Sequence, residues 1–179
     1  MRIAISGSHR VGKTSLAEAL AAALPGYALV PEPYHALEDE GHEFGEMPSL
    51  DDFILQLERS LESLEQSGAD TIFDRCPLDI VAYLQTHDEG SAFELPQWSE
   101  RIREAMTLLT LVVLVPIEQP DRISIPREEH RLRGVVDETL ENLVMDGRFA
   151  GEIEVLPVAG TLESRLAQAH ACWRRLQAV

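Results

Sequence analysis

Gly7-Ser8-His9-Arg10-Val11-Gly12-Lys13-Thr14 is the stretch that decides the fold of this chain. The octet fits the P-loop pattern GxxxxGK[ST], in which glycines let the backbone curl so that successive N–H groups face phosphate oxygens. Lys13, the only lysine in 179 residues, places a compact positive charge near the β- and γ-phosphates, and the Thr14 hydroxyl can bind Mg²⁺. A helix that begins here also turns its positive end toward the anion.

The segments on either side of the octet are those that the motif requires. Residues 1–6 are apolar and favour a strand, and residues 14–24 favour a helix with leucines on one face. We therefore expect nucleotide binding by Gly7, His9, Arg10, Val11, Gly12, Lys13, Thr14 and Ser15. Backbone amides are expected to do this binding, while the side chains of Ser8, His9 and Arg10 face solvent.

Composition limits the classes of protein to consider. The net charge of −16 and the pI near 4.6 argue against nucleic acid or an anionic membrane as a partner. No apolar run reaches transmembrane length, and because the first residues favour a strand at once, we expect no signal peptide. Two cysteines make no disulfide framework, so we expect a protein of the reducing cytoplasm. The oligomeric state stays open.

Strands and helices alternate along the rest of the chain. Further strands are expected at 27–30, 69–74, 108–115 and 153–158, and the fourth, nearly all apolar, suits a parallel strand covered on both faces. Helices are expected at 49–67, where Ser49 is the cap, and at 77–86, 96–106, 135–145 and 162–176, while 34–48 is expected to be a loop with at most one helical turn. This order predicts one α/β domain over residues 1–179, with a parallel sheet that binds its ligand at the carboxyl ends of the strands.

Asp74 and Arg75 follow the third expected strand, at that edge of the sheet. A carboxylate there can hold the Mg²⁺ of a bound nucleotide, and the planar guanidinium of Arg75 can clamp a phosphate or order the acceptor. The alternative is a helix-capping aspartate beside a surface arginine. The sequence favours the functional interpretation because the P-loop should lie at the same edge.

Glu32 lies between two prolines, Pro31 and Pro33, after the second expected strand. The prolines restrict the backbone, so a carboxylate held there would face the same crevice as Lys13. It could accept the proton of a substrate hydroxyl as that oxygen attacks the γ-phosphate. The alternative is an ordinary loop glutamate in an acidic region.

Residues 121–133 carry four arginines against three acidic residues, a local reversal of the charge of the chain. Arg127 and Arg131 would share one face of a helix. With Arg133 they could form a mobile flap that closes over the triphosphate, excludes water and stabilises the transferring phosphoryl group. The alternative is a solvated helix with internal ion pairs.

Three weaker candidates complete the site. The turn at Gly160 and Thr161 can pass its backbone along an adenine ring, or it can be a plain turn between a strand and a helix. Gln56 and Arg59, on the long helix, could face an acceptor, although such residues are more often surface polar groups.

These motifs together resemble the P-loop small-molecule kinases, in the group of nucleoside, thymidylate and ribosylnicotinamide kinases and their AAA-labelled ATPase relatives. The resemblance rests on 7–14, Glu32-Pro33, the Asp74-Arg75-Cys76-Pro77 segment, the arginine segment and Gly160-Thr161, spread in family order over nearly the whole chain. It implies a three-layer P-loop NTPase fold with a five-stranded parallel sheet in the order 2-3-1-4-5. It also implies Mg²⁺-ATP as donor, Thr14 and Asp74 at the metal, Glu32 as base and an inserted lid at about 121–134.

Other P-loop classes lack their signatures. A Ras-like GTPase reads guanine with Asn-Lys-x-Asp, for which no lysine remains; a transporter-type ATPase needs an LSGGQ-like segment; and an oligomeric motor would have Asp-Glu where Asp74-Arg75 stands.

Charge also bears on the acceptor. Residues 14–58 should wall the acceptor site and contain no lysine or arginine, so we expect a hydroxyl-bearing small molecule without a phosphate, such as a nucleoside or a ribosylnicotinamide-like compound. A different class stays open: a regulatory ATPase module that docks a protein partner through its acidic loop at 38–46.

Overall fold

Five parallel strands form one sheet in the computed structural model, which describes residues 1–45, 47–87, 93–121, 126–149 and 151–178, without the side chains of 127–129. The order is β2-β3-β1-β4-β5, with every neighbouring pair parallel, which confirms the order that the resemblance to the P-loop kinases implies. The strands are β1 (Arg2–Ser6), β2 (Ala28–Val30), β3 (Thr71–Asp74), β4 (Leu111–Leu114) and β5 (Glu154–Pro157).

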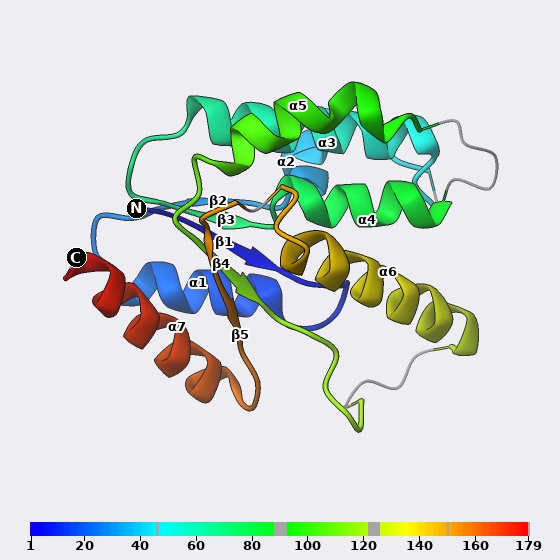
Figure 1. Ribbon diagram of the computed structural model, residues 1–179. Coiled ribbons are helices and arrows are strands. Elements are labelled where there is room, and N and C mark those ends of the chain that lie inside the picture. The colour runs from blue at the N-terminus through cyan, green and yellow to red at the C-terminus, as the bar shows by residue number, and fades with distance from the viewer. Residues whose placement is uncertain (46, 88–92, 122–125, 150, 179) are drawn as a thin grey trace.

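Helices cover both faces of this sheet (Figure 1). Helices α1 and α7 lie on one face, and α3, α4, α5 and α6 pack on the other, while the short α2 contacts α3. Their bounds are α1 (Lys13–Ala23), α2 (Pro33–Asp39), α3 (Leu50–Gln66), α4 (Pro77–His87), α5 (Leu95–Met106), α6 (Arg127–Met145) and α7 (Leu162–Gln177).

Successive side chains of the central strands point to opposite faces of the sheet, so the hydrophobic core has one layer on each face. In β1, Ile3 and Ile5 pack against α1 and α7, whereas Ala4 points to the side of α3 to α6. All four residues of β4 are buried, as expected for a parallel strand with helices on both faces. Burial of both faces fixes the strand register, because a slip of one residue would exchange the two sets of side chains.

The carboxyl ends of β1, β2 and β3 meet at one edge of the sheet. Ile5 is in register with Asp74, and Val30 with Phe73, so the P-loop, the Glu32 segment and the Asp74-Arg75 segment emerge side by side. Helix α1 begins at Lys13, directly after Gly12. The fold thus brings together three of the motifs that are separated in the sequence.

Two helices are longer than expected. Residues 33–39 form α2, where at most one helical turn was expected, and Pro33 occupies its first turn, where proline is favoured. Helix α6 begins at Arg127, eight residues before the expected start, so residues 127–134 of the expected lid are helical, and their role as a lid stays a prediction. Residues 122–125 of the flap lie outside the described part of the chain.

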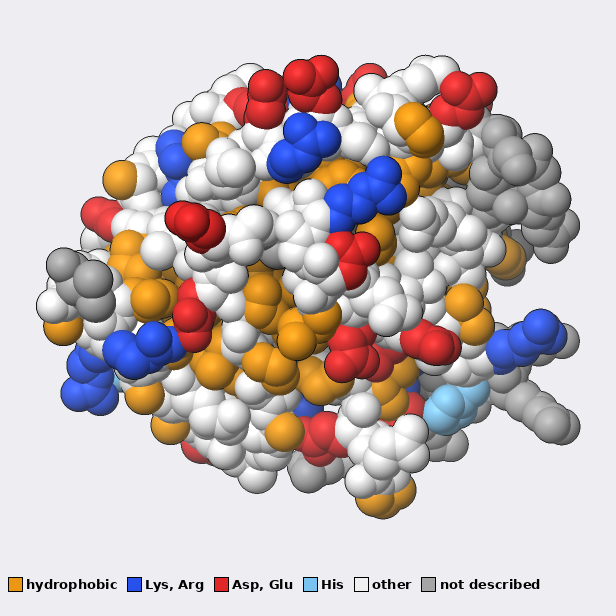
Figure 2. Space-filling model, in the orientation of Figure 1, with side chains coloured by type: hydrophobic (Ala, Val, Ile, Leu, Met, Phe, Trp, Pro, Cys, Tyr) orange, Lys and Arg blue, Asp and Glu red, His pale blue; other side chains and the backbone are white. Residues whose placement is uncertain are grey.

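Figure 2 shows the face of the molecule seen in Figure 1, where acidic and basic side chains are interspersed around hydrophobic ones. The edge strand β5 crosses this face, and its residues are only partly buried. Among the described residues, none of the helices is both long and apolar enough to cross a bilayer.

Ser49 starts α3 with a capping box, as expected. Its hydroxyl accepts the Asp52 amide at 3.2 Å, and the Asp52 carboxylate accepts the Ser49 amide at 2.8 Å. Replacing Ser49 with alanine should lower the free energy of unfolding by about 1 kcal/mol in urea titration. Ser63→Ala in the same helix, where the hydroxyl only donates to the Arg59 carbonyl, is the control and should change it by less than about 0.5 kcal/mol. Equal effects would contradict this account of the cap.

Candidate active site

The P-loop has the backbone shape that its glycines allow. Gly7 has φ 153°, and a Cβ added there would lie 2.4 Å from the Val115 carbonyl oxygen, so only glycine fits. Gly12 also has positive φ, at 91°. Lys13 is 4% exposed, and its Nζ donates to the Ser8 carbonyl at 2.7 Å inside the loop. The loop therefore surrounds its own ammonium group.

A cavity of about 340 Å³ opens on this loop. Glu32 and Arg75 close its far side, which places the three motifs around one space. Burial, followed by the charge of Arg75, lowers the pKa of Lys13 from 10.5 to about 8. The other residues that line the cavity are His9, Arg10, Gly12, Lys13, Thr14 and Ser15.

Asp74 and Thr14 meet at the edge of this cavity. The Thr14 hydroxyl donates to Asp74 Oδ2 at 2.6 Å, and Asp74 Oδ1 is buried with no hydrogen-bond partner in the described part of the chain. Burial raises the pKa of Asp74. An unpaired carboxylate oxygen beside a hydroxyl suits a hard cation such as Mg²⁺. No cluster of three or more His, Cys, Asp or Glu side chains among the described residues could hold a metal, so phosphates and waters would have to complete its coordination.

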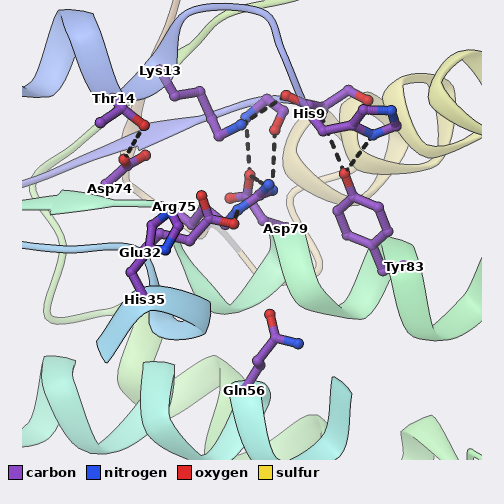
Figure 3. A network of polar contacts seen from close by, with 12 residues as sticks. His9, Lys13, Thr14, Glu32, His35, Gln56, Asp74, Arg75, Asp79 and Tyr83 are labelled. Atoms are coloured by element: carbon purple, nitrogen blue, oxygen red, sulfur yellow. Dashed lines mark hydrogen bonds and ion pairs between the residues drawn. The ribbon is translucent and has the colours of Figure 1, made fainter. Parts of the chain in front are cut away.

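Glu32 and Arg75 form a largely buried ion pair, with Arg75 Nε 2.5 Å from Glu32 Oε1 (Figure 3). Arg75 has φ 83°, a left-handed conformation that is uncommon for a non-glycine residue and common at functional sites. Burial alone would raise the pKa of Glu32, but the charges of Arg75 and Lys13 outweigh it and hold the pKa below its usual value. Glu32 is therefore ionised at neutral pH.

Asp79, in the first turn of α4, is a residue of this site that the sequence did not single out. Its fully buried carboxylate accepts the Ser6 hydroxyl at 2.6 Å, the Gly7 amide at 3.0 Å and the Cys76 amide at 2.9 Å. It also lies 3.5 Å from Arg75 Nη1. Asp79 thus ties the start of the P-loop to the Arg75 segment. An acidic residue in a first helical turn was the only available signal, and that signal normally means capping.

A second cavity, of about 330 Å³, shares Glu32, Arg75 and His9 with the first. Aromatic rings form much of its wall: Tyr83 stacks on Phe53 at 5.4 Å between centroids, and the Arg75 guanidinium lies 5.4 Å from the centre of the Tyr83 ring. Its other lining residues are Tyr34, Met47, Pro48, Gln56, Ile80, His87 and Leu132.

Both residues that were weaker candidates on α3 can now be placed. Gln56 is 3% exposed and extends from α3 toward this second cavity, which it lines (Figure 3). Arg59 forms an ion pair with Glu40 at 2.6 Å and does not line the cavity.

The three P-loop side chains that were expected to face solvent, those of Ser8, His9 and Arg10, differ in their exposure. Arg10 is exposed and has φ 58°, as expected for a side chain outside the loop. Ser8 is fully buried, contrary to expectation, because its hydroxyl donates to the Arg133 carbonyl at 3.1 Å. His9 is half-buried, and both its amide and its ring Nδ1 contact the Tyr83 hydroxyl, at 3.2 and 2.9 Å.

The arginines of residues 121–133 differ in their surroundings. Arg133 is 2% exposed: its Nε donates to the His9 carbonyl at 2.9 Å, and its guanidinium pairs with Asp121. Arg131 is exposed, and the Arg127 side chain lies outside the described part of the structure. Arg133 is therefore a buried residue that contacts the P-loop through the His9 carbonyl.

A third cavity, of about 260 Å³, also borders the P-loop, and Gly160 contacts one of its lining residues, Glu118. The Gly160 amide donates to Glu118 at 2.6 Å, and Glu118 pairs with Arg165, which also donates to the Val11 carbonyl at 2.6 Å. The Thr161 hydroxyl caps α7. Contacts from the last helix thus reach the loop, and no local sequence signal indicates this arrangement. The cavity is lined by Arg10, Val11, Gly12, Pro116, Glu118, Asp121, Arg133 and Arg165.

Sheet order, loop and site define a P-loop NTPase fold of the kinase type. The chain belongs to the AAA domain family, whose model matches residues 2–165, which confirms the expected family. No curated protein matches the chain.

Several solved kinases have the same fold. A deoxyadenosine kinase from M. mycoides, solved with the products dCMP and dCDP, superposes with a TM-score of 0.67 at 15% identity, covering 98% of this chain and 100% of that one. Thymidylate kinase from Ehrlichia chaffeensis gives 0.68 at 12% identity, with 97% and 98% covered. Thymidylate kinase from Candida albicans gives 0.64 at 16%, with 98% and 92% covered. Identities this low establish the fold alone.

The lowered pKa of Lys13 predicts how nucleotide affinity depends on pH. Lys13 is protonated below about pH 8 and loses its charge above it, so a triphosphate should bind more weakly as pH rises. Loss of this charge should raise the dissociation constant for Mg·ATP, measured by calorimetry, about tenfold between pH 7 and pH 9. Lys13→Arg, which stays charged, should abolish this dependence. Affinity that is constant across this range in the unmodified protein would contradict the prediction.

Proposed function

We propose that this protein is an ATP- and Mg²⁺-dependent phosphotransferase that moves the γ-phosphate to a hydroxyl of a small molecule, with a nucleoside or a ribosylnicotinamide-like compound as acceptor. One observation carries the proposal. The cavity on the P-loop and the aromatic cavity beside it share Glu32 and Arg75, so a donor in one and an acceptor in the other would meet at these two side chains. The kinase fold of the solved relatives supports the same conclusion.

On this proposal, the triphosphate lies in the P-loop, where the amides and the Lys13 ammonium neutralise its charge. Thr14 and Asp74 would hold the magnesium ion, whose charge, when bound, further neutralises the phosphate oxygens. The base of the nucleotide would extend toward the third cavity, near Gly160. Arg10, which lines both the first and the third cavities, would then lie along the polyphosphate.

Glu32 is assigned to the acceptor hydroxyl. Its carboxylate is ionised and held by Arg75, so it can orient the hydroxyl and accept its proton as the oxygen attacks the γ-phosphorus. A carboxylate with a lowered pKa is a weak base, and phosphoryl transfer rests chiefly on positioning and electrostatics. Orientation of the oxygen is therefore the larger part of its role, with proton transfer late in the reaction.

The charges of the second cavity support an acceptor without a phosphate. Arg75 is the only lysine or arginine among its described lining residues, and it is already paired with Glu32 and close to Asp79. Arg59, the other nearby cation, is paired with Glu40 outside the cavity. An acceptor phosphate would meet the Glu32 carboxylate without a spare cation to offset it. The stacked rings suit a planar heterocycle instead.

The position of the acidic segment bears on the alternative of a regulatory ATPase. Tyr34, in α2, and Met47 and Pro48, after the acidic segment, line the second cavity. Tyr34 also stacks on Phe44 at 4.1 Å. The residues on both sides of the acidic segment thus line a small-molecule cavity, which favours the phosphotransferase over a docking surface. Glu46 lies outside the described residues.

A phosphotransfer screen tests the proposal. We expect purified protein with Mg·ATP to phosphorylate at least one compound among nucleosides, ribosylnicotinamide and small alcohols, in preference to nucleoside monophosphates. Mass spectrometry identifies the product, and ATP hydrolysis without an acceptor gives the background. A clear preference for monophosphates would refute the acceptor class. ATP hydrolysis that responds to none of these compounds would refute the phosphotransferase itself.

Replacing Glu32 with glutamine tests its role. The amide keeps an oxygen for Arg75 but loses the charge, so kcat should fall by about 10²-fold or more while Mg·ATP affinity stays nearly unchanged. Glu38→Gln, an exposed residue of α2 that pairs with His35, is the matched control and should retain full activity. A Glu32→Gln variant with near-normal kcat would remove Glu32 from the mechanism.

A further inference from the structure

His9 is the one P-loop residue, among those described, that lines the aromatic acceptor cavity as well as the phosphate cavity. Its backbone is committed elsewhere: the amide donates to the Tyr83 hydroxyl at 3.2 Å, and the carbonyl accepts Arg133 Nε at 2.9 Å. The expectation that the His9 amide binds phosphate therefore does not fit this geometry. Both the amide and the ring of His9 are turned toward Tyr83 of α4.

Tyr83 sets the chemical form of the His9 ring. The hydroxyl already accepts the His9 amide, and its remaining hydrogen can go to Nδ1, 2.9 Å away. Burial raises the pKa of Tyr83, so the phenol keeps this proton. Burial and the charges of Arg75, Arg133 and Lys13 lower the pKa of His9 to about 4. The ring is then neutral, with Nδ1 as acceptor and an N–H on Nε2.

The side chains that pack against Tyr83, those of Phe53 and Arg75, also line the acceptor cavity. The Tyr83 ring stacks on Phe53 of α3 within 7° of parallel, and the Arg75 guanidinium lies 5.4 Å from the centre of the same ring. A shift of Tyr83 would therefore move His9 together with two walls of the cavity. Figure 3 shows His9 and Tyr83 facing each other, on the opposite side of the site from Thr14 and Asp74.

We propose that His9, oriented by Tyr83, is a positioning residue for the acceptor, which it contacts as a neutral hydrogen-bonding group, and not a ligand of the nucleotide phosphates. This inference rests on the proposed function, because it requires an acceptor in the aromatic cavity. Because His9 lines both cavities, its neutral N–H could donate a hydrogen bond to an uncharged oxygen near the reacting hydroxyl of the acceptor. A phosphate ligand would instead be a cation or a free backbone amide.

Separate affinities for the two substrates test the inference. The acceptor probe is whichever of deoxyadenosine, thymidine and ribosylnicotinamide binds the unmodified protein most tightly in calorimetry. His9→Ala should weaken binding of that probe about tenfold and leave Mg·ATP binding within about twofold. His9→Gln carries an amide nitrogen about as far from the backbone as Nε2 and should recover part of the loss. Tyr83→Phe should weaken the probe and spare Mg·ATP.

Matched controls lie on the far side of the sheet. His170→Ala removes a ring that stacks on Trp173, and Tyr27→Phe removes a hydroxyl that accepts the Trp173 indole N–H. Neither should change either affinity. Retained Mg·ATP binding also shows that the variants are folded.

Two results would overturn the inference: equal weakening of Mg·ATP and probe in His9→Ala, or unchanged probe affinity. Binding of the probe without phosphate transfer by the unmodified protein would refute the proposed function alone, because these affinities are read without turnover. If none of the three compounds binds, the inference is overturned, and the wider phosphotransfer screen decides the proposed function.

Discussion

Arg75 is a buried cation around which the rest of the site is arranged. Its side chain is 6% exposed and contacts Glu32 after β2, the Gly7 carbonyl after β1 and Asp79 in α4. A guanidinium in such a place is stable only with charged and hydrogen-bonding partners around it. The same contacts hold the ends of three segments at fixed distances. The arrangement is unfavourable in two respects, because the charge of Arg75 is buried and its backbone has a positive φ.

The consequence is that two cavities meet at one ion pair. The P-loop cavity has the amides, lysine and oxygen ligands that a metal-bound triphosphate needs, and the neighbouring cavity has stacked rings and little net charge. Glu32 lies between them because β2 ends beside β3, where Asp74 and Arg75 begin the next segment. Sheet topology alone thus brings a potential base to the phosphates.

Much of the fold could be predicted from sequence because the relevant signals are local. The octet at 7–14, its preceding strand and its following helix are consecutive in the sequence, so they can be recognised together. The apolar segments that alternate with helical ones predict the positions of the strands in the sheet. Residues 33–39 were missed because a short, acidic helix has weak periodicity, although Pro33 after Glu32 is a signal for a helix start.

The contacts within the site could not be predicted in the same way. Asp79, Tyr83, Glu118 and Arg165 act through partners up to 154 positions away in the chain, as with Arg165 and the Val11 carbonyl. A single sequence carries no record of such pairs. The arginine segment illustrates the same limit, since its composition favours phosphate binding, whereas Arg133 is buried against the His9 carbonyl and Asp121.

A crystal structure with a bisubstrate analogue, adenosine joined through a polyphosphate to an acceptor nucleoside, is the most direct test of the account. The polyphosphate should lie in the loop at 7–14, with the adenosine toward Gly160 and the acceptor ring in the cavity lined by Phe53 and Tyr83. The oxygen that links acceptor and phosphate should then lie within hydrogen-bond distance of Glu32. An acceptor end bound outside that cavity, or a polyphosphate away from Lys13, would contradict the account.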